Sequence, residues 1–448
     1  MEFNKSEVFE DLLEPLIPIY NNAYSRSCPK LEDESWIKVG IQRTLSEMNS
    51  GRGFLEKLII EGPDYLSCDH YFESLKSQRR LHHCQELNKQ LLISIKICLS
   101  ENDPFKDYSE LSGFDLYAGD GHSHKAPIHE IKIDDKKYET QHYYRLCLRS
   151  HVMSHMTLAL YGGARKKEHD MHALKRLDRD VLRNGAKKGQ KVLYVWDKAG
   201  IDFSQWEKWK NQSGVYFLSE EKELNRLLVI GEPYFDKNDP VNAGVINYEA
   251  VSTANGNSIF MVTYKCPETE KIFKFLTNLP RSIRPGVIAH LYRTRWDIER
   301  KYNLLKHKLY ERRAWANTPT AKTMQANFIC LTHNLALIFN QIIEPEVDVT
   351  AYDIQRRESR AKDAIEKIEK SGKKAAPQVF NTKRVTELPK RLFAWLRAWV
   401  FKVTPWNQAM ENLKLLFRSR NYAKAGHWHR TTDTHDCIFG ENIDGVVF

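Results

Sequence analysis

Several features that would place a chain in a common functional class are missing from these 448 residues. The eight cysteines are scattered and form no C-x-x-C pair, which excludes a zinc ribbon or a dithiol redox motif and predicts reduced, mostly buried thiols. No stretch approaches the roughly 18 consecutive apolar residues of a membrane span. No G-x-x-x-x-G-K-[ST] motif occurs, so ATP-driven chemistry is not expected.

The N-terminal segment also lacks a recognisable targeting signal. It reads MEFNKSEVFEDLLEP, which is acidic and has no basic-then-apolar layout of a signal peptide, so we expect a cytoplasmic or DNA-associated protein. The formal net charge of +10 fits a polyanionic partner, because Lys and Arg that neutralise phosphates release counterions. Charge alone is weak evidence, since many basic proteins bind no nucleic acid.

The hydrophobic pattern divides the chain into segments of different periodicity. Helical spacing gives way to short apolar runs in the order strand, strand, helix, strand, which predicts a mixed α/β core. A strand-rich block follows, in which Asn255-Gly256 predicts a hairpin, and then helical spacing returns. The expected units are a helical N-terminal DNA-binding domain at 1–105, a first core part at 106–221, an all-β insertion at 222–285, a second core part at 286–345, and a linker with a helical C-terminal domain at 346–448.

A burst of basic residues lies in the last helical pattern of the N-terminal unit. Lys76, Arg79, Arg80, His82 and His83 fall within eight positions. A solvated helix face and a DNA-contacting helix explain this burst equally well.

The sharpest pattern is a stripe formed by Tyr292, Arg295, Glu299 and Lys306, with spacings of 3, 4 and 7 residues. At about 100° per residue, all four lie within an arc of about 60° on one helix. An acid flanked by basic groups and a tyrosine suits a metal ion beside a DNA backbone. The alternative is a surface helix with i,i+4 ion pairs.

Two aspartates stand at the ends of apolar runs. Asp197 follows the run VLYVW and precedes a glycine turn, with Asp202 as a more distant competitor. Asp120 stands where FDLYAG meets a second glycine, and Asp115, five residues earlier, points to the opposite strand face. Each aspartate could instead be a simple turn or cap residue.

Three acids on separate elements are what two-metal phosphoryl transfer requires. Asp120, Asp197 and Glu299 would offer only oxygen ligands, which suit two Mg²⁺ ions, with Mn²⁺ as a substitute. Gathered carboxylates repel one another, so at least one pKa should be raised without metal.

The helix stripe resembles a known signature. Tyr292, Arg295, Glu299 and Lys306 fit Y-x2-R-x3-E-x6-K, the pattern of transposases of insertion-sequence family four. DKAGID is similar to that family's D-R-G-Y/F block, GDGH to its D-G-T block, and FKFLTNLP to its T-x-L-P stretch. The resemblance covers about residues 110–340, with Lys198 in place of the usual Arg and His122 in place of the usual Thr.

The resemblance implies an α/β, ribonuclease-H-like catalytic core interrupted by the β insertion and flanked by helical domains. It implies that Asp120, Asp197 and Glu299 form the catalytic, metal-binding triad, while Tyr292, Arg295 and Lys306 contact DNA phosphates. The insertion of relatives supplies an aromatic side chain that stacks on a flipped base. Here the candidates for that role are Tyr264, Phe273 and Phe275.

The implied function is cut-and-paste DNA transposition by a bacterial, nucleoid-associated enzyme. Its partners would be double-stranded DNA, as terminal inverted repeats and target, and a second copy of the chain, with a C-terminal helix as the expected dimer interface. One alternative is a transposase-derived DNA-binding protein that no longer cuts. Another is a ribonuclease-H-like nuclease without strand transfer. A transition-metal site at His122, His124 and His129 is less favoured, because no matching Cys or His cluster follows.

Overall fold

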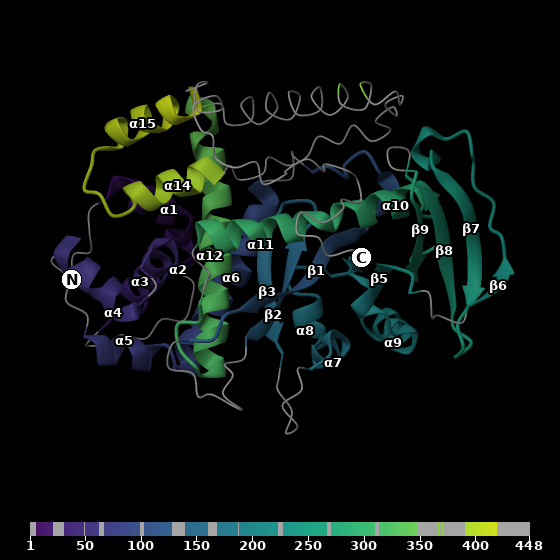
Figure 1. Cartoon of the computed structure of the whole chain (residues 1–448), viewed down its shortest axis with the longest axis horizontal. Helices are drawn as coiled ribbons and strands as arrows, with labels where there is room; N and C mark the ends of the chain where they lie inside the picture. The colour runs from purple at the N-terminus through teal and green to yellow at the C-terminus, as the bar shows by residue number, and fades with distance from the viewer. Residues whose placement is uncertain are drawn as a thin grey trace.

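One mixed sheet runs from the middle of the protein to one end, and the N-terminal helices gather beyond its other end (Figure 1). The computed structural model describes residues 6–20, 31–48, 50–61, 67–98, 103–127, 139–159, 168–186, 188–222, 227–266, 270–309, 313–347, 366, 370 and 390–418. The helices are α1 (Glu7–Leu13), η1 (Glu14–Leu16), α2 (Ile17–Tyr20), α3 (Asp33–Leu45), α4 (Gly51–Glu61), α5 (Cys68–Ser74), α6 (Gln78–Cys98), η3 (Ser109–Leu111), α7 (Asp170–Lys175), α8 (Arg179–Leu182), η4 (Lys198–Gly200), α9 (Phe203–Ser213), η5 (Pro240–Asn242), α10 (Pro285–Thr294), α11 (Trp296–Lys308), α12 (Pro319–Val347), α14 (Lys390–Trp399) and α15 (Trp406–Arg418).

The strands are β1 (Phe114–His124), β2 (Thr140–Cys147), β3 (Met153–Leu158), β4 (Lys191–Val195), β5 (Val215–Glu220), β6 (Leu228–Gly231), β7 (Val245–Ser252), β8 (Ser258–Lys265) and β9 (Ile272–Thr277). Their order in the sheet is β3-β2-β1-β4-β5-β9-β8-β7-β6. Strands β1, β4 and β5 are parallel, whereas β2 and β3 pair antiparallel. This mixed α/β arrangement is compatible with a ribonuclease-H-like domain.

The strand-rich block at 222–285 continues the central sheet. Its last strand, β9, pairs antiparallel with β5 from Leu218↔Thr277 to Glu220↔Phe275. The hairpin predicted at Asn255-Gly256 joins β7 to β8, and Gly256 has a φ of +80°, which favours glycine. The strands are therefore where the sequence predicts them, but in the described residues they share one sheet with the core.

The long helix α12 stands between the N-terminal helices and the sheet (Figure 1). By length and composition it is the one helix among the described residues that could cross a membrane, yet 83% of its apolar window is buried inside the protein. Asn334 helps to hold α12 against the sheet. The Asn334 side chain accepts from Met153 N at 3.0 Å and donates to Met153 O at 2.9 Å. The helix thus satisfies backbone groups at the β3 edge of the sheet.

The basic burst at 76–83 holds helices together. Arg79 donates twice to the fully buried carboxylate of Asp33, at 2.5 and 2.7 Å, which ties α6 to α3. Arg80 lies 3.6 Å from the same carboxylate, donates to Leu31 O, and packs over the Trp36 ring. These two arginines therefore have a structural role, and the DNA-contacting interpretation of the burst stays a prediction.

Two further helix predictions need correction or limits. The helix in the predicted order strand, strand, helix, strand is divided into α7 and α8, because Asp178 accepts from Val181 N and starts a new helix. At the C-terminus, α14 and α15 form as expected and pack against α1 and α12. Most of the predicted linker, and everything after Arg418, lies outside the described residues.

Candidate active site

Asp120 and Asp197 lie at the same level of two neighbouring strands. The last β1–β4 pair is Ala118↔Val195, and each aspartate stands two residues beyond it. The carboxyl ends of parallel strands share one sheet edge, where side chains are free to act on a ligand. Asp120 does not end its strand, as the sequence suggested, because β1 continues to His124 by pairing with β2.

The ring of Trp196 brings the two aspartate blocks into close contact. Trp196 is fully buried, and a Cβ at Gly119 would lie 1.7 Å from its Cζ3 atom. A Cβ at Gly200 would lie 2.5 Å from its Cδ1 atom. Gly119, beside Asp120, and Gly200, three residues after Asp197, therefore both have to be glycine to leave room for this tryptophan.

The competing aspartates have structural roles. Asp202 accepts from Gln205 N, caps α9, and lies 2.5 Å from the Lys175 ammonium. Its pKa is lowered by these hydrogen bonds, which outweigh its partial burial. Asp115 is buried within the β1–β4 pairing opposite Val192, away from the strand ends.

The helix that carries Glu299 is interrupted at Arg295. The helices α10 and α11 meet there, and the Arg295 and Ile298 N–H groups bond three residues back instead of four. Arg295 keeps right-handed helical dihedral angles, so the two helices follow each other across the sheet (Figure 1). The single helix predicted from the sequence is therefore two helices with a tightened turn between them.

The guanidinium of Arg295 bridges two of the predicted acids. Its Nη1 atom lies 2.7 Å from Glu299 Oε1 and 3.9 Å from Asp120 Oδ2, so the two carboxyl groups are only a few ångströms apart. The Arg295 side chain is 5% exposed, whereas those of Asp120 and Glu299 are 18% and 29% exposed. Water and ions can therefore reach the carboxyl groups although the arginine is buried.

The electrostatics of the site disfavour three negative charges. Burial raises the pKa of Asp120 to about 8, the positive charge of Arg295 opposes this shift, and the Asp197 and Glu299 carboxylates add to it. Burial likewise raises the pKa of Asp197 and of Glu299, again against the opposing effect of Arg295. The three acids thus interact with one another, and Arg295 only partly opposes the rise in their pKa values.

The three acids have the chemistry, though not the spacing, of a divalent-cation site in this structure. Three carboxylates supply the hard oxygen ligands that Mg²⁺ and Mn²⁺ prefer, so the donor chemistry fits. Their spacing is looser than expected, because no three His, Cys, Asp or Glu side chains in the described part of the chain are close enough to hold one ion. The Arg295 guanidinium supplies the cation that bridges Asp120 and Glu299 in this structure.

Tyr292, the first residue of the helix stripe, is less exposed than expected. Tyr292 is 3% exposed, its hydroxyl donates to Glu220 Oε2 at 3.3 Å, and burial raises its pKa. Its ring packs against Phe275, with the centroids 4.7 Å apart. A direct phosphate contact by Tyr292 is therefore not available in this conformation. The Lys306 side chain lies outside what the structure describes.

Two of the three base-stacking candidates are buried. Tyr264 is 2% exposed and Phe275 is fully buried against Tyr292 and Tyr264. Phe273 is partly exposed on β9 and stacks on Phe275. Of the three, Phe273 alone presents surface that a base could reach.

The histidines near Asp120 are packing residues. The His122 ring stacks on Tyr302 at 4.5 Å, and the Tyr302 hydroxyl donates to Asp120 O at 2.8 Å. The His124 ring stacks on His142 at 4.0 Å. His129 lies outside the described residues, and the described histidines form no metal-binding group with other ligand residues.

Three contributors were missed in the sequence. Tyr302 anchors α11 to the backbone of Asp120. Ser219, at the end of β5, donates to Asp197 O at 2.8 Å, and Glu220 beside it binds both Tyr292 and Lys198. The available signal was the polar end Ser-Glu of the apolar run VYFL, the same signal that identified Asp197.

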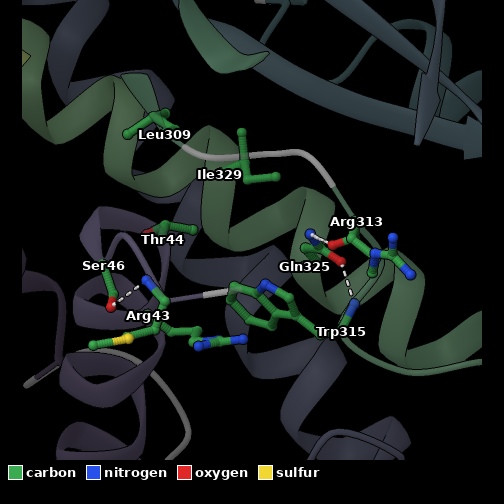
Figure 2. A pocket seen from close by; sticks show the side chains of 9 residues that line it. Arg43, Thr44, Ser46, Leu309, Arg313, Trp315, Gln325 and Ile329 are labelled. Carbon is green, nitrogen blue, oxygen red and sulfur yellow. Dashed lines mark hydrogen bonds between the residues drawn. The ribbon is translucent and has the colours of Figure 1, made fainter. Parts of the chain in front are cut away.

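A small pocket lies apart from the acids, between α3 and α12. Figure 2 shows Trp315 and Arg43 facing each other across it, with the Arg43 guanidinium 5.8 Å from the indole centroid. Gln325 fixes its rim by accepting from Trp315 N and donating to Arg313 O. The pocket contains none of the three carboxylates.

Comparison with known families agrees with this geometry. No curated protein matches the chain. Residues 114–335 match the sequence model of a family described as the transposase DDE domain, and Asp120, Asp197 and Glu299 all fall within that segment. The match supports a DDE transposase.

Proposed function

We propose that the protein is a DNA transposase that binds the terminal inverted repeats of an insertion sequence and moves it by cut-and-paste. In the first step, water attacks the phosphodiester at the element end and the P–O3′ bond breaks, which leaves a 3′-OH. In the second step, that 3′-OH attacks a phosphodiester of target DNA and displaces its 3′ oxygen. Both steps are in-line displacements at phosphorus, so one site serves both.

The observation that carries the proposal is that Arg295 bridges Asp120 and Glu299, with Asp197 close enough to act on the pKa of both acids. These acids come from two neighbouring parallel strands and a helix that are far apart in sequence. Divalent cations, two of them in the proposed site, would supply the charge that activates the attacking oxygen and stabilises the leaving one. The carboxylates would hold them, and Arg295, released from Glu299, would take a phosphate oxygen.

Tyr292 and Lys306 complete the stripe that resembles insertion-sequence family four. We propose that Lys306 binds a phosphate near the element end. We propose that Tyr292, which is buried with its hydroxyl on Glu220, serves the DNA contact by supporting Arg295 and not by touching a phosphate itself. Two copies of the chain would pair the two element ends.

The test is cleavage of DNA that contains the flanking inverted repeats, with Mg²⁺ or Mn²⁺. The wild-type protein should release 3′-OH ends and join them to a plasmid, whereas Glu299→Gln should bind the DNA with little change and not cut it. Undiminished cutting by Glu299→Gln would refute the assignment. Binding without cleavage by the wild type would favour the silent DNA-binding alternative, and cleavage without joining would favour the nuclease.

A further inference from the structure

Glu220 is a fourth carboxylate at the same sheet edge. It ends β5, the strand next to β4, and its side chain is 24% exposed. Strands β1, β4 and β5 are parallel, so their carboxyl ends bring Asp120, Asp197 and Glu220 to one side of the sheet. The role of Glu220 differs from that of the other two, because its oxygens already have partners.

Each oxygen of Glu220 binds a different part of the proposed active site. Oε1 lies 2.9 Å from the ammonium of Lys198, the residue after Asp197. Oε2 accepts from the Tyr292 hydroxyl at 3.3 Å. The preceding residue, Ser219, is fully buried and donates to Asp197 O. The end of β5 therefore connects the Asp197 turn to the helix stripe.

The contact with Tyr292 extends to the acids. The Tyr292 ring lies 4.7 Å from the Phe275 ring between centroids, and the Arg295 guanidinium carbon lies 5.6 Å from the Tyr292 ring centroid. The Tyr292 hydroxyl donates to Glu220 and also interacts with Arg295. Because Arg295 rests on that ring and bridges Asp120 and Glu299, a displaced tyrosine would displace the arginine as well.

A role in overall stability explains these contacts poorly. The Lys198 side chain is 42% exposed, and an ion pair this accessible contributes little to stability. A role in geometry explains them better, since small displacements at a reacting centre can reduce the rate by up to about a hundredfold.

We propose that Glu220 is a positioning residue for the phosphodiester chemistry, which sets the places of Lys198, Tyr292 and, through Tyr292, Arg295. This role rests on the proposed function. With this role, Lys198 would lie beside Asp197 on the surface that binds the DNA backbone. The end of β5 would then belong to the active site.

The test compares Glu220→Ala, Tyr292→Phe and their double variant in the full-length protein, with cleavage of end-containing DNA measured at saturating and limiting DNA. Glu220→Ala should lower the cleavage rate at saturation about tenfold with the thermal midpoint unchanged. Glu220→Gln should recover part of the rate, because its amide oxygen still accepts from Tyr292. Glu221→Gln is the matched control, since Glu221 is the next residue and also faces a lysine, Lys274, at 3.6 Å.

The double variant separates positioning from a merely structural role. If Glu220 acts through Tyr292, the double variant should be no slower than the slower single variant. Full activity of Glu220→Ala, or rate losses that multiply in the double variant, would overturn the role while leaving the proposed function standing. A wild-type protein that does not cut would overturn the proposed function, and this role with it.

Discussion

The guanidinium of Arg295 donates a 2.7 Å hydrogen bond to Glu299, one helical turn further along the chain. The same nitrogen lies 3.9 Å from Asp120, so one buried arginine bridges two acids that come from a strand and a helix. A surface i,i+4 pair would be largely exposed, whereas this arginine is 5% exposed. The pair is therefore part of a site, and its arginine carries the charge that a divalent cation would also bring.

Replacement of Arg295 by methionine should affect metal binding and catalysis in opposite directions. Loss of the guanidinium removes a positive charge beside Asp120 and Glu299, so Mn²⁺ should bind about tenfold more tightly. Cleavage should nevertheless fall, because the phosphate contact is lost. Titration with Mn²⁺ followed by electron paramagnetic resonance gives the first quantity and a cleavage assay gives the second. Weaker Mn²⁺ binding would contradict the view that arginine and metal compete for the same acids.

The raised pKa of Asp120 predicts how stability depends on pH without metal. Its value in the folded protein is about 8, against an ordinary 3.8, so between these values the folded state keeps a proton that the unfolded state has lost. The free energy of unfolding should therefore fall as pH rises from about 4 to 8. Asp120→Asn should reduce this dependence and stabilise the protein at pH 8, while the raised pKa values of Asp197 and Glu299 keep the part that they contribute.

Thermal unfolding in EDTA at several pH values measures the effect. Glu221→Gln is a suitable control, because it removes a carboxylate from the neighbourhood of β5 without touching Asp120. If the wild-type protein and Asp120→Asn showed parallel profiles, the carboxyl group of Asp120 would not be the group that titrates.

The close approach of Trp196 to Gly119 predicts a specific pair of variants. Gly119→Ala should destabilise the protein by about 1–3 kcal/mol and reduce cleavage, since its Cβ would collide with the indole next to Asp120. Adding Trp196→Phe should recover part of that loss, because the smaller ring leaves room for a methyl group. Urea unfolding of the two single variants and the double variant checks this. A double variant that loses the sum of both effects would show that the contact is not responsible.

The sequence predicts the candidate acids better than it predicts their surroundings. Asp197, Asp120 and Glu299 could be chosen as candidates because each follows an apolar run or a helical period of a recognisable kind. The contact of Arg295 with Asp120, and that of Glu220 with Tyr292, could not be predicted, because they depend on how the helices pack against the sheet and on which strands become neighbours in it. The β5–β9 pairing that brings Phe275 against Tyr292 joins residues more than fifty positions apart, and no local pattern encodes it.

The arginines of α6 give a prediction that separates structure from DNA binding. Asp33→Ala should lower the free energy of unfolding by about 3–5 kcal/mol, because it leaves the buried Arg80 and the paired Arg79 without their shared carboxylate.

Arg79→Ala should also destabilise the protein, yet leave the salt dependence of DNA binding unchanged, since a residue that touches no phosphate releases no counterion. Lys76→Ala is the comparison, because Lys76 is 48% exposed on the turn before α6 and pairs with the exposed Glu73. Urea unfolding and DNA binding at several salt concentrations measure both quantities. A reduced salt slope for Arg79→Ala would return α6 to the DNA-binding surface.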